Sequence, residues 1–206
     1  MKNKDLDFET KAIHVGQDPD PVTGAVIPPI YTTSTYAQES PGEHKGYDYS
    51  RTSNPTRHAF EVCLASLEEG EKAHAFSSGV AAISACVELL QPGDHIIAMD
   101  DLYGGTVRLF NEIKSISQGI EISYVDMSKE ENIEASIKPN TKMLFAETPT
   151  NPLLKIIDLE KLADFARSKN IITVADNTFC SPYIQRPLTK GFDYVIHSAT
   201  KYLCGH

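Results

Sequence analysis

Short apolar runs alternate with helical patterns along most of this chain, and no other feature limits the fold as strongly. The run Ile171–Ala175 consists of apolar and β-branched residues, which is typical of a strand buried on both faces. The stretch before it, Asp158–Ser168, instead carries its apolar residues at helical spacing. Because the two patterns recur in turn, the sequence predicts an α/β fold built on a mostly parallel sheet.

The predicted elements form one series. Helices are expected over Thr56–Glu68, Val80–Leu90, Leu102–Ser117, Lys129–Ile137 and Asp158–Ser168. Strands are expected over Ala73–Phe76, His95–Met99, Glu121–Val125, Lys142–Glu147, Ile171–Ala175 and Tyr194–Ile196.

The first 58 residues differ from the rest, because proline and glycine interrupt them too often for long elements. An arm of this length usually packs on another subunit or carries function. We therefore expect two parts, an N-terminal arm over 1–58 that contacts a neighbouring subunit and a larger domain over 59–206.

Charge and composition exclude several classes of protein. With 28 acidic against 19 basic side chains, the net charge of −9 argues against a nucleic-acid binder. No apolar run approaches the roughly 20 residues of a membrane span, and Met1–Thr10 has no secretory core. The four cysteines are scattered and the seven histidines form no ligand motif, so we expect a cytoplasmic protein without a metal site.

A lysine follows the last predicted strand. Lys201 comes five residues after Ile196, and Ser198 and Thr200 lie between them. A lysine amine can form an imine with a carbonyl cofactor, and two hydroxyl groups could bind a phosphate beside it. A solvated surface lysine is the alternative.

Two further strand ends carry polar groups. Ser78 and Gly79 lead from an expected strand into a helix, an arrangement that offers N–H groups and a positive dipole to an anion. A serine that simply caps the helix is the alternative. Asp176 ends the buried run Ile171–Ala175, where its carboxylate needs a partner such as a protonated ring nitrogen. A helix cap or a hydrogen-bonded turn would also explain it.

Aromatic and amide side chains complete the pattern. Tyr103, beside Gly104 and Gly105, could stack on a flat ring or merely cover the core. Asn151 lies in a proline-rich loop after another strand. In the arm, Tyr49 and Arg51 project to one side of an extended chain and could grip a phosphate, although a solvated arm with an incidental arginine is the simpler interpretation of this pair alone.

Ligands of parallel sheets bind at the carboxyl ends of the strands, where most of these groups fall. An anion cradle, a stacking tyrosine, an acid for a ring nitrogen and an imine-forming lysine together describe pyridoxal 5′-phosphate (PLP).

The motifs that carry this pattern resemble those of the PLP-dependent family of cysteine and methionine metabolism, of aspartate-aminotransferase fold type. They are Tyr49-Ser50-Arg51 with Asn54-Pro55-Thr56, Phe76-Ser77-Ser78-Gly79, Asp101-Leu102-Tyr103-Gly104-Gly105-Thr106, Glu147-Thr148-Pro149-Thr150-Asn151-Pro152, Asp176-Asn177-Thr178-Phe179 and His197-Ser198-Ala199-Thr200-Lys201-Tyr202. The family includes cystathionine γ-synthase, γ-lyase and β-lyase, O-acetylhomoserine sulfhydrylase and methionine γ-lyase.

The resemblance implies a role for each residue. Lys201 would bind the cofactor covalently and shuttle protons, and Tyr103 would stack on the ring and assist catalysis. Asp176 would keep the ring nitrogen protonated. The phosphate would be bound by Ser78, Gly79, Ser198 and Thr200, with Tyr49 and Arg51 supplied by a neighbouring subunit. Val80 and Thr178 complete the expected cofactor site. Asn151 would lie near the substrate carboxylate or the phenolic oxygen of the cofactor, and Arg108 would meet a distal carboxylate of the substrate.

The same resemblance implies trans-sulfuration at the γ-carbon of an amino acid, in a homo-oligomer that is a dimer of dimers. Gly105 argues against methionine γ-lyase, which carries cysteine there. Arg108 resembles the γ-synthase and γ-lyase members, and the run Ser181–Leu188 favours the γ-lyase side. Because the family continues far beyond its lysine, we expect this chain to be an N-terminal part without the C-terminal domain. An inactive fragment that at most binds PLP is the competing interpretation. A nucleotide-binding α/β enzyme is disfavoured, because the phosphate-loop and dinucleotide fingerprints are missing.

Overall fold

The computed structural model describes residues 6–205, and these divide into two compact units, Met1–Ala75 and Phe76–His206. Residues 1–5 of the expected arm and His206 of the expected domain lie outside the described residues. The division falls later in the sequence than the expected boundary after residue 58, and whether the arm contacts another subunit stays a prediction.

The first unit contains two helices and a small hairpin. Helix α1 (Phe8–His14) packs on helix α2 (Pro55–Glu68), and β1 (Gln38–Ser40) pairs antiparallel with β2 (Glu43–His44). The Asn54 side chain caps α2 by accepting the Thr56 N–H at 2.9 Å, and Pro55 occupies the first helical turn. Helix α1 corrects the expectation of an irregular arm.

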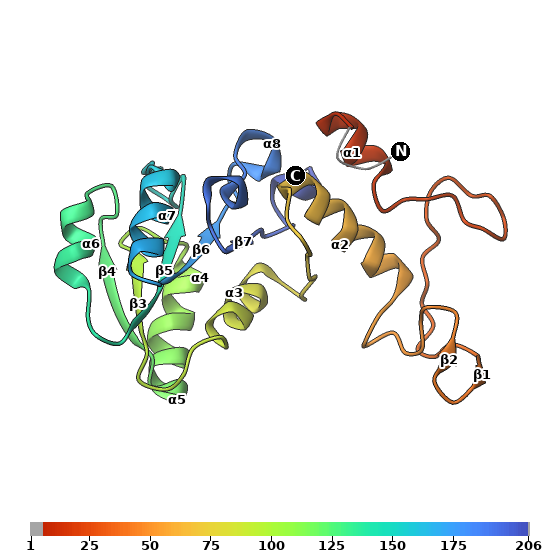
Figure 1. Ribbon diagram of the computed structural model, residues 1–206, viewed down its shortest axis with the longest axis horizontal. Helices are drawn as coiled ribbons and strands as arrows, with labels where there is room; N and C mark the ends of the chain where they lie inside the picture. The colour runs from red at the N-terminus through yellow and green to blue at the C-terminus, as the bar shows by residue number, and fades with distance from the viewer. Residues whose placement is uncertain (1–5, 206) are drawn as a thin grey trace. The chain divides into compact units, whose positions relative to one another are not determined.

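The second unit is built on a parallel five-stranded sheet with the strand order β4-β3-β5-β6-β7. In Figure 1 the strand labels follow this order from left to right. The strands are β3 (His95–Met99), β4 (Glu121–Val125), β5 (Thr141–Glu147), β6 (Ile172–Asp176) and β7 (Tyr194–Ile196). The predicted α/β class with a parallel sheet is confirmed.

Helices connect the strands and cover both faces of the sheet. They are α3 (Gly79–Val87), α4 (Gly104–Arg108), the π-helical η2 (Leu109–Lys114), α5 (Ser115–Gln118), α6 (Glu130–Ser136), α7 (Leu159–Ser168), α8 (Ser181–Ile184), η3 (Pro187–Lys190) and η4 (Tyr202–Cys204). Helix α3 packs on α4 and η2, whereas α6 and α7 pack against β4 and β6. Right-handed crossovers to opposite sides of β3 place these two groups on opposite faces.

The core lies where both faces are covered. Every residue of β3 is buried, as are all of β5 except Lys142. The rings of Phe110 on η2 and Phe145 on β5 meet edge to face, with centroids 5.2 Å apart. Aromatic pairs in this geometry add about 1 kcal/mol to the burial of their surface. The core therefore fixes the positions of the strand ends.

Two predicted elements need correction. Ala73–Phe76 forms no strand, because the Ala75 N–H donates to the Glu61 side chain and no neighbouring strand is available to it. The helix expected over Leu102–Ser117 begins at Gly104 and passes through the π-helical turn. Among residues 6–205 no helix has both the length and the apolar character of a membrane span. No cluster of metal-ligating side chains occurs in the same range.

The strand order creates a switch point. The connection that follows β3 leads to β4 on one side of it, and β5 lies on the other side. At such a point the loops after the two strands separate and leave a crevice at the carboxyl ends.

Candidate functional site

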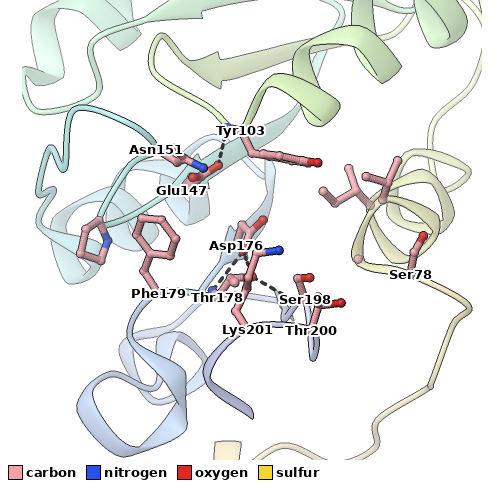
Figure 2. Close-up of a pocket in the computed structure, with 14 residues that line it drawn as sticks. Ser78, Tyr103, Glu147, Asn151, Asp176, Thr178, Phe179, Ser198, Thr200 and Lys201 are labelled. Carbon is pink, nitrogen blue, oxygen red and sulfur yellow. Dashed lines mark hydrogen bonds between the residues drawn. The ribbon is translucent and has the colours of Figure 1, made fainter. Parts of the chain in front are cut away.

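A cavity of about 200 Å³ lies at these carboxyl ends, entirely within the second unit. Figure 2 shows the side chains that surround it. Residues of five different segments line it: Ser78, Gly79, Val80, Ile83, Tyr103, Glu147, Pro149, Asn151, Asp176, Thr178, Phe179, Ser198, Thr200 and Lys201.

The N-terminus of α3 forms one wall. The Ser78 hydroxyl caps the helix by accepting the Ala81 N–H at 3.1 Å, as the alternative interpretation of this serine required. The next residue has no side chain, and a Cβ atom on Gly79 would lie 3.0 Å from the Ser198 Cβ. Glycine thus lets the helix end and the loop after β7 approach each other. N–H groups and hydroxyls converge there, as an anion requires.

Asp176 ends β6 and is buried. Its Oδ1 accepts hydrogen bonds from the Thr178 N–H at 3.0 Å and from the Thr178 hydroxyl at 2.5 Å. Burial raises the pKa of Asp176, against the opposing effects of these two bonds and of His197. A cationic group in the cavity would stabilise the ionised form.

The Thr178 hydroxyl also joins two loops. It accepts the Ser198 N–H at 2.9 Å while it donates to Asp176. Through this single oxygen, the carboxylate after β6 and the serine loop after β7 hold each other in place.

Tyr103 forms the opposite wall, at the N-terminus of α4. Its N–H donates to Glu147 Oε2 at 2.9 Å, and its ring extends into the cavity (Figure 2). The ring passes so close to Gly105 that a Cβ atom there would lie 2.4 Å from ring carbon Cε1. The position of the ring therefore depends on the main-chain hydrogen bond to Glu147 and on the absence of a side chain at Gly105.

Lys201 and Thr200 lie at the exposed side of the cavity. The Lys201 N–H donates to the Ser198 carbonyl at 3.1 Å, which folds the segment after β7 back toward the strand. The side chain of Lys201 is exposed rather than buried. Asn151 reaches the cavity from the loop after β5.

Three predicted residues lie elsewhere. Tyr49 and Arg51 belong to the first unit, where the Arg51 guanidinium lies 5.0 Å from the centre of the Tyr49 ring. Arg108 is exposed on α4 and does not line the cavity. The roles expected for these three residues stay predictions.

Four lining residues had been given no role: Ile83, Glu147, Pro149 and Phe179. Glu147 and Phe179 belong to motifs that the sequence displays, and Glu147 ends a buried strand as Asp176 does. That position is the signal that would have identified it. Nothing in the sequence distinguishes Ile83 from the other apolar residues of its helix, so its place in the cavity could not be predicted.

The donor set fits PLP. The cradle at Gly79 and its neighbouring hydroxyls suits a phosphate, the buried Asp176 carboxylate suits a ring nitrogen, and the Lys201 amine suits an aldehyde. The Tyr103 ring offers a flat apolar face. Fold and site together define a PLP-binding protein built on a parallel α/β sheet.

Comparisons with known proteins agree. The family model for Cys/Met metabolism PLP-dependent enzymes matches residues 9–206. The chain belongs to this family.

Named relatives are similar over nearly the whole chain. A cystathionine β-lyase of Coxiella burnetii is 57% identical, over 99% of this chain and 53% of its own length. A probable cystathionine γ-synthase of Herpetosiphon aurantiacus is 53% identical, over 98% and 63% respectively. The crystal structure of cystathionine γ-lyase from Lactobacillus plantarum, complexed with L-serine, is 46% identical with a TM-score of 0.94, over 98% and 52%.

The chain therefore spans about half to two thirds of the length of these relatives. Their names cover three activities, so similarity establishes the family and its cofactor but does not choose among the reactions.

Proposed function

We propose that this chain provides the PLP-binding part of a trans-sulfuration enzyme that acts at the γ-carbon of an amino acid, as a cystathionine γ-lyase or γ-synthase. One observation carries the proposal: an amine, a buried carboxylate, a tyrosine ring and a helix N-terminus surround one cavity. PLP, when bound, supplies an electron sink for the charge that remains when a bond at the Cα of an amino acid breaks.

The chain's own residues then divide the work. Lys201 would hold the aldehyde carbon and afterwards carry a proton to and from the substrate. Asp176 would stabilise positive charge on the ring nitrogen, and Thr178 would hold Asp176 in place. The phosphate would be bound by Ser78, Gly79, Val80, Ser198 and Thr200.

Residues at the rim would select the substrate. Asn151 would meet the amino acid near the cofactor, and Arg108 would bind a distal carboxylate. The packing of the Tyr103 ring on Gly105 supports a member of the family other than methionine γ-lyase, because a side chain at position 105 would displace this ring.

A second candidate is cleavage at the β-carbon. The 57% identity to a named cystathionine β-lyase favours it. The two reactions differ in which carbon–sulfur bond of cystathionine breaks. Cleavage on the γ side releases cysteine, and cleavage on the β side releases homocysteine. O-acetylhomoserine sulfhydrylase activity is a further possibility within the family.

The proposed assembly is a homo-oligomer, a dimer of dimers, in which Tyr49 and Arg51 of one subunit reach the phosphate of another. Its substrates are small amino acids such as cystathionine, cysteine or an activated homoserine. Cytoplasmic location and the absence of nucleic-acid and membrane partners stay predictions from the sequence.

A product assay tests the function. The PLP-loaded chain is incubated with cystathionine, and the released thiol is identified by mass spectrometry; a parallel reaction contains activated homoserine and cysteine. We expect cysteine from the first reaction or cystathionine from the second. Lys201→Ala serves as the inactive control. Lys161→Ala, which removes an exposed lysine side chain on α7, serves as the matched control.

If homocysteine is the released thiol, the γ-specific proposal is wrong and the reaction is that of a cystathionine β-lyase. If the chain binds PLP but neither reaction proceeds above the Lys201→Ala control, the non-catalytic interpretation is correct for these 206 residues.

A further inference from the structure

Two acidic side chains end neighbouring strands beside the cavity. Glu147 is the last residue of β5 and Asp176 the last of β6, and the two are direct partners in the parallel register. Partners in adjacent parallel strands lie roughly 4.8 Å apart and direct their side chains to the same face. Both line the cavity, with exposures of 6% and 8%. Two carboxyl groups thus share one poorly hydrated space.

Glu147 is tied to the loop on the other side of the switch point. Its Oε2 accepts the Tyr103 N–H at 2.9 Å, drawn as a dashed line in Figure 2. Tyr103 follows β3 and Glu147 ends β5, so this hydrogen bond joins two segments of the cavity wall that are far apart in sequence.

The surroundings of the two carboxyls differ. Asp176 accepts a hydroxyl and an N–H from Thr178, and His197 further favours its charge. Glu147 faces two acids, Asp176 and Asp101, and accepts the main-chain N–H of Tyr103. Lys201 is the one cationic side chain that lines the described cavity, and it extends from the loop after β7. Neighbouring buried carboxyls resist simultaneous ionisation, so the proton belongs on the less supported of the two.

We propose that Glu147 is a positioning residue of this site: its carboxyl group fixes the main chain of Tyr103, and it keeps a proton so that Asp176 alone carries the negative charge. The proposal rests on the proposed function only for the identity of the ligand. Burial, followed by the charges of Asp176 and Asp101, raises the pKa of Glu147 to about 8, which agrees with the geometry.

The arrangement has a consequence for binding. A single carboxylate in the cavity can pair with a single cationic nitrogen, whereas a second ionised carboxylate would lack a partner and would be costly to bury. A neutral Glu147 still accepts an N–H through its carbonyl oxygen. It can therefore hold the Tyr103 loop without adding a charge.

Amide hydrogen exchange tests the positioning role in the chain without PLP. In Glu147→Ala, the Tyr103 amide loses its acceptor, and we expect it to exchange about tenfold faster, as the loss of one hydrogen bond predicts. Glu147→Gln keeps one acceptor oxygen and should show a smaller increase. Glu121→Gln, which removes an exposed carboxyl bound to Lys138, is the matched control and should leave the Tyr103 amide unchanged. An unchanged rate at Tyr103 in Glu147→Ala overturns the role.

The proton is tested by the carboxyl ¹³C resonance of Glu147, assigned by its loss in Glu147→Gln. In the wild-type chain we expect a midpoint near pH 8, which moves downward in Asp176→Asn because the neighbouring charge is gone. A midpoint near the ordinary value of 4.5, or no movement in Asp176→Asn, contradicts the proposal.

This titration needs no unstable variant, so it decides the question even if Glu147→Ala does not fold. Neither measurement contains PLP. A failure of the proposed function would instead appear in cofactor binding or turnover, with both results here unchanged.

Discussion

The ring of Tyr103 packs directly on Gly105, where a Cβ atom would lie only 2.4 Å from ring carbon Cε1. Every residue except glycine at position 105 must therefore move the ring. Tyr103 and Gly105 lie two positions apart. The Tyr103 ring lines the cavity, and the absence of a side chain at Gly105 leaves room for that ring.

Replacing Gly105 should displace the ring. We expect Gly105→Ala to weaken PLP binding by about fivefold, because the ring must leave the position in which it would stack on the cofactor, an interaction of roughly 1 kcal/mol. Titration of the apo chain with PLP, followed by absorbance, measures the change. Gly104→Ala is the matched control, since the nearest atom to its Cβ is an Arg108 nitrogen at 3.9 Å. Equal affinities of the two variants would contradict this account.

Replacing Gly79 should push apart the two segments that form the expected phosphate site, the N-terminus of α3 and the loop after β7. In Gly79→Ala the new methyl group would lie 3.0 Å from the Ser198 Cβ and 3.2 Å from its Cα, so α3 and the serine loop must move apart. Affinity for inorganic phosphate and for PLP should fall together. In the double variant Gly79→Ala with Ser198→Gly the closest contact is gone, and part of the loss from Gly79→Ala should be recovered. A strictly additive double variant would show that the two residues do not interact.

The Thr178 hydroxyl should matter more than its methyl group. Thr178→Val leaves the Ser198 N–H without its acceptor and Asp176 without one of its two Thr178 donors, which costs about 1–3 kcal/mol of unfolding free energy. It should also raise the pKa of Asp176 further, since one bond to the charged form is lost. Thr178→Ser retains the hydroxyl and is the control. Urea denaturation of both variants checks the prediction, and similar losses in the two would refute it.

Stability should fall as the pH rises toward the pKa of Glu147. The folded chain keeps this proton up to about pH 8, whereas the unfolded chain releases it near 4.5. Between these values the folded state binds more protons, so its stability decreases with rising pH and levels off above 8. We expect the difference in unfolding free energy between wild type and Glu147→Gln to shift by a few kcal/mol, at most about 5, over this window. Asp176 is common to both proteins and cancels from the difference. Parallel pH curves would rule the titration out.

Much of the fold could be predicted because periodicity is a local property. Tyr194–Ile196 was predicted with the bounds that the structure has, and Ile171–Ala175 differs by one residue from β6. Ala73–Phe76 has the same apolar character but no neighbouring strand, and pairing cannot be read from one segment. Helix α1 was missed although Asp7 and Glu9 at its start and His14 at its end are ordinary helix signals. The many prolines that follow concealed it.

The site was less accessible than the fold. Lys201 follows β7 and Asp176 ends β6, and the rule for parallel sheets brought them to one edge. Ser78 lines the same cavity although the strand expected before it does not form. Glu147 follows a strand too, yet its part depends on the register with Asp176 and on a bond to Tyr103. Both are contacts between segments that are far apart in the chain, and such contacts cannot be predicted from local sequence patterns. The place of Gly105 under the Tyr103 ring is likewise visible only in three dimensions.

The central claim is that this cavity holds PLP through Lys201. The most direct test is to load the chain with PLP, reduce it with borohydride, and map the pyridoxyl group by peptide mass spectrometry. We predict a single modified peptide that carries the group on Lys201, and its loss in Lys201→Ala but not in Lys161→Ala. A label spread over exposed lysines, or one that persists unchanged in Lys201→Ala, would contradict the account.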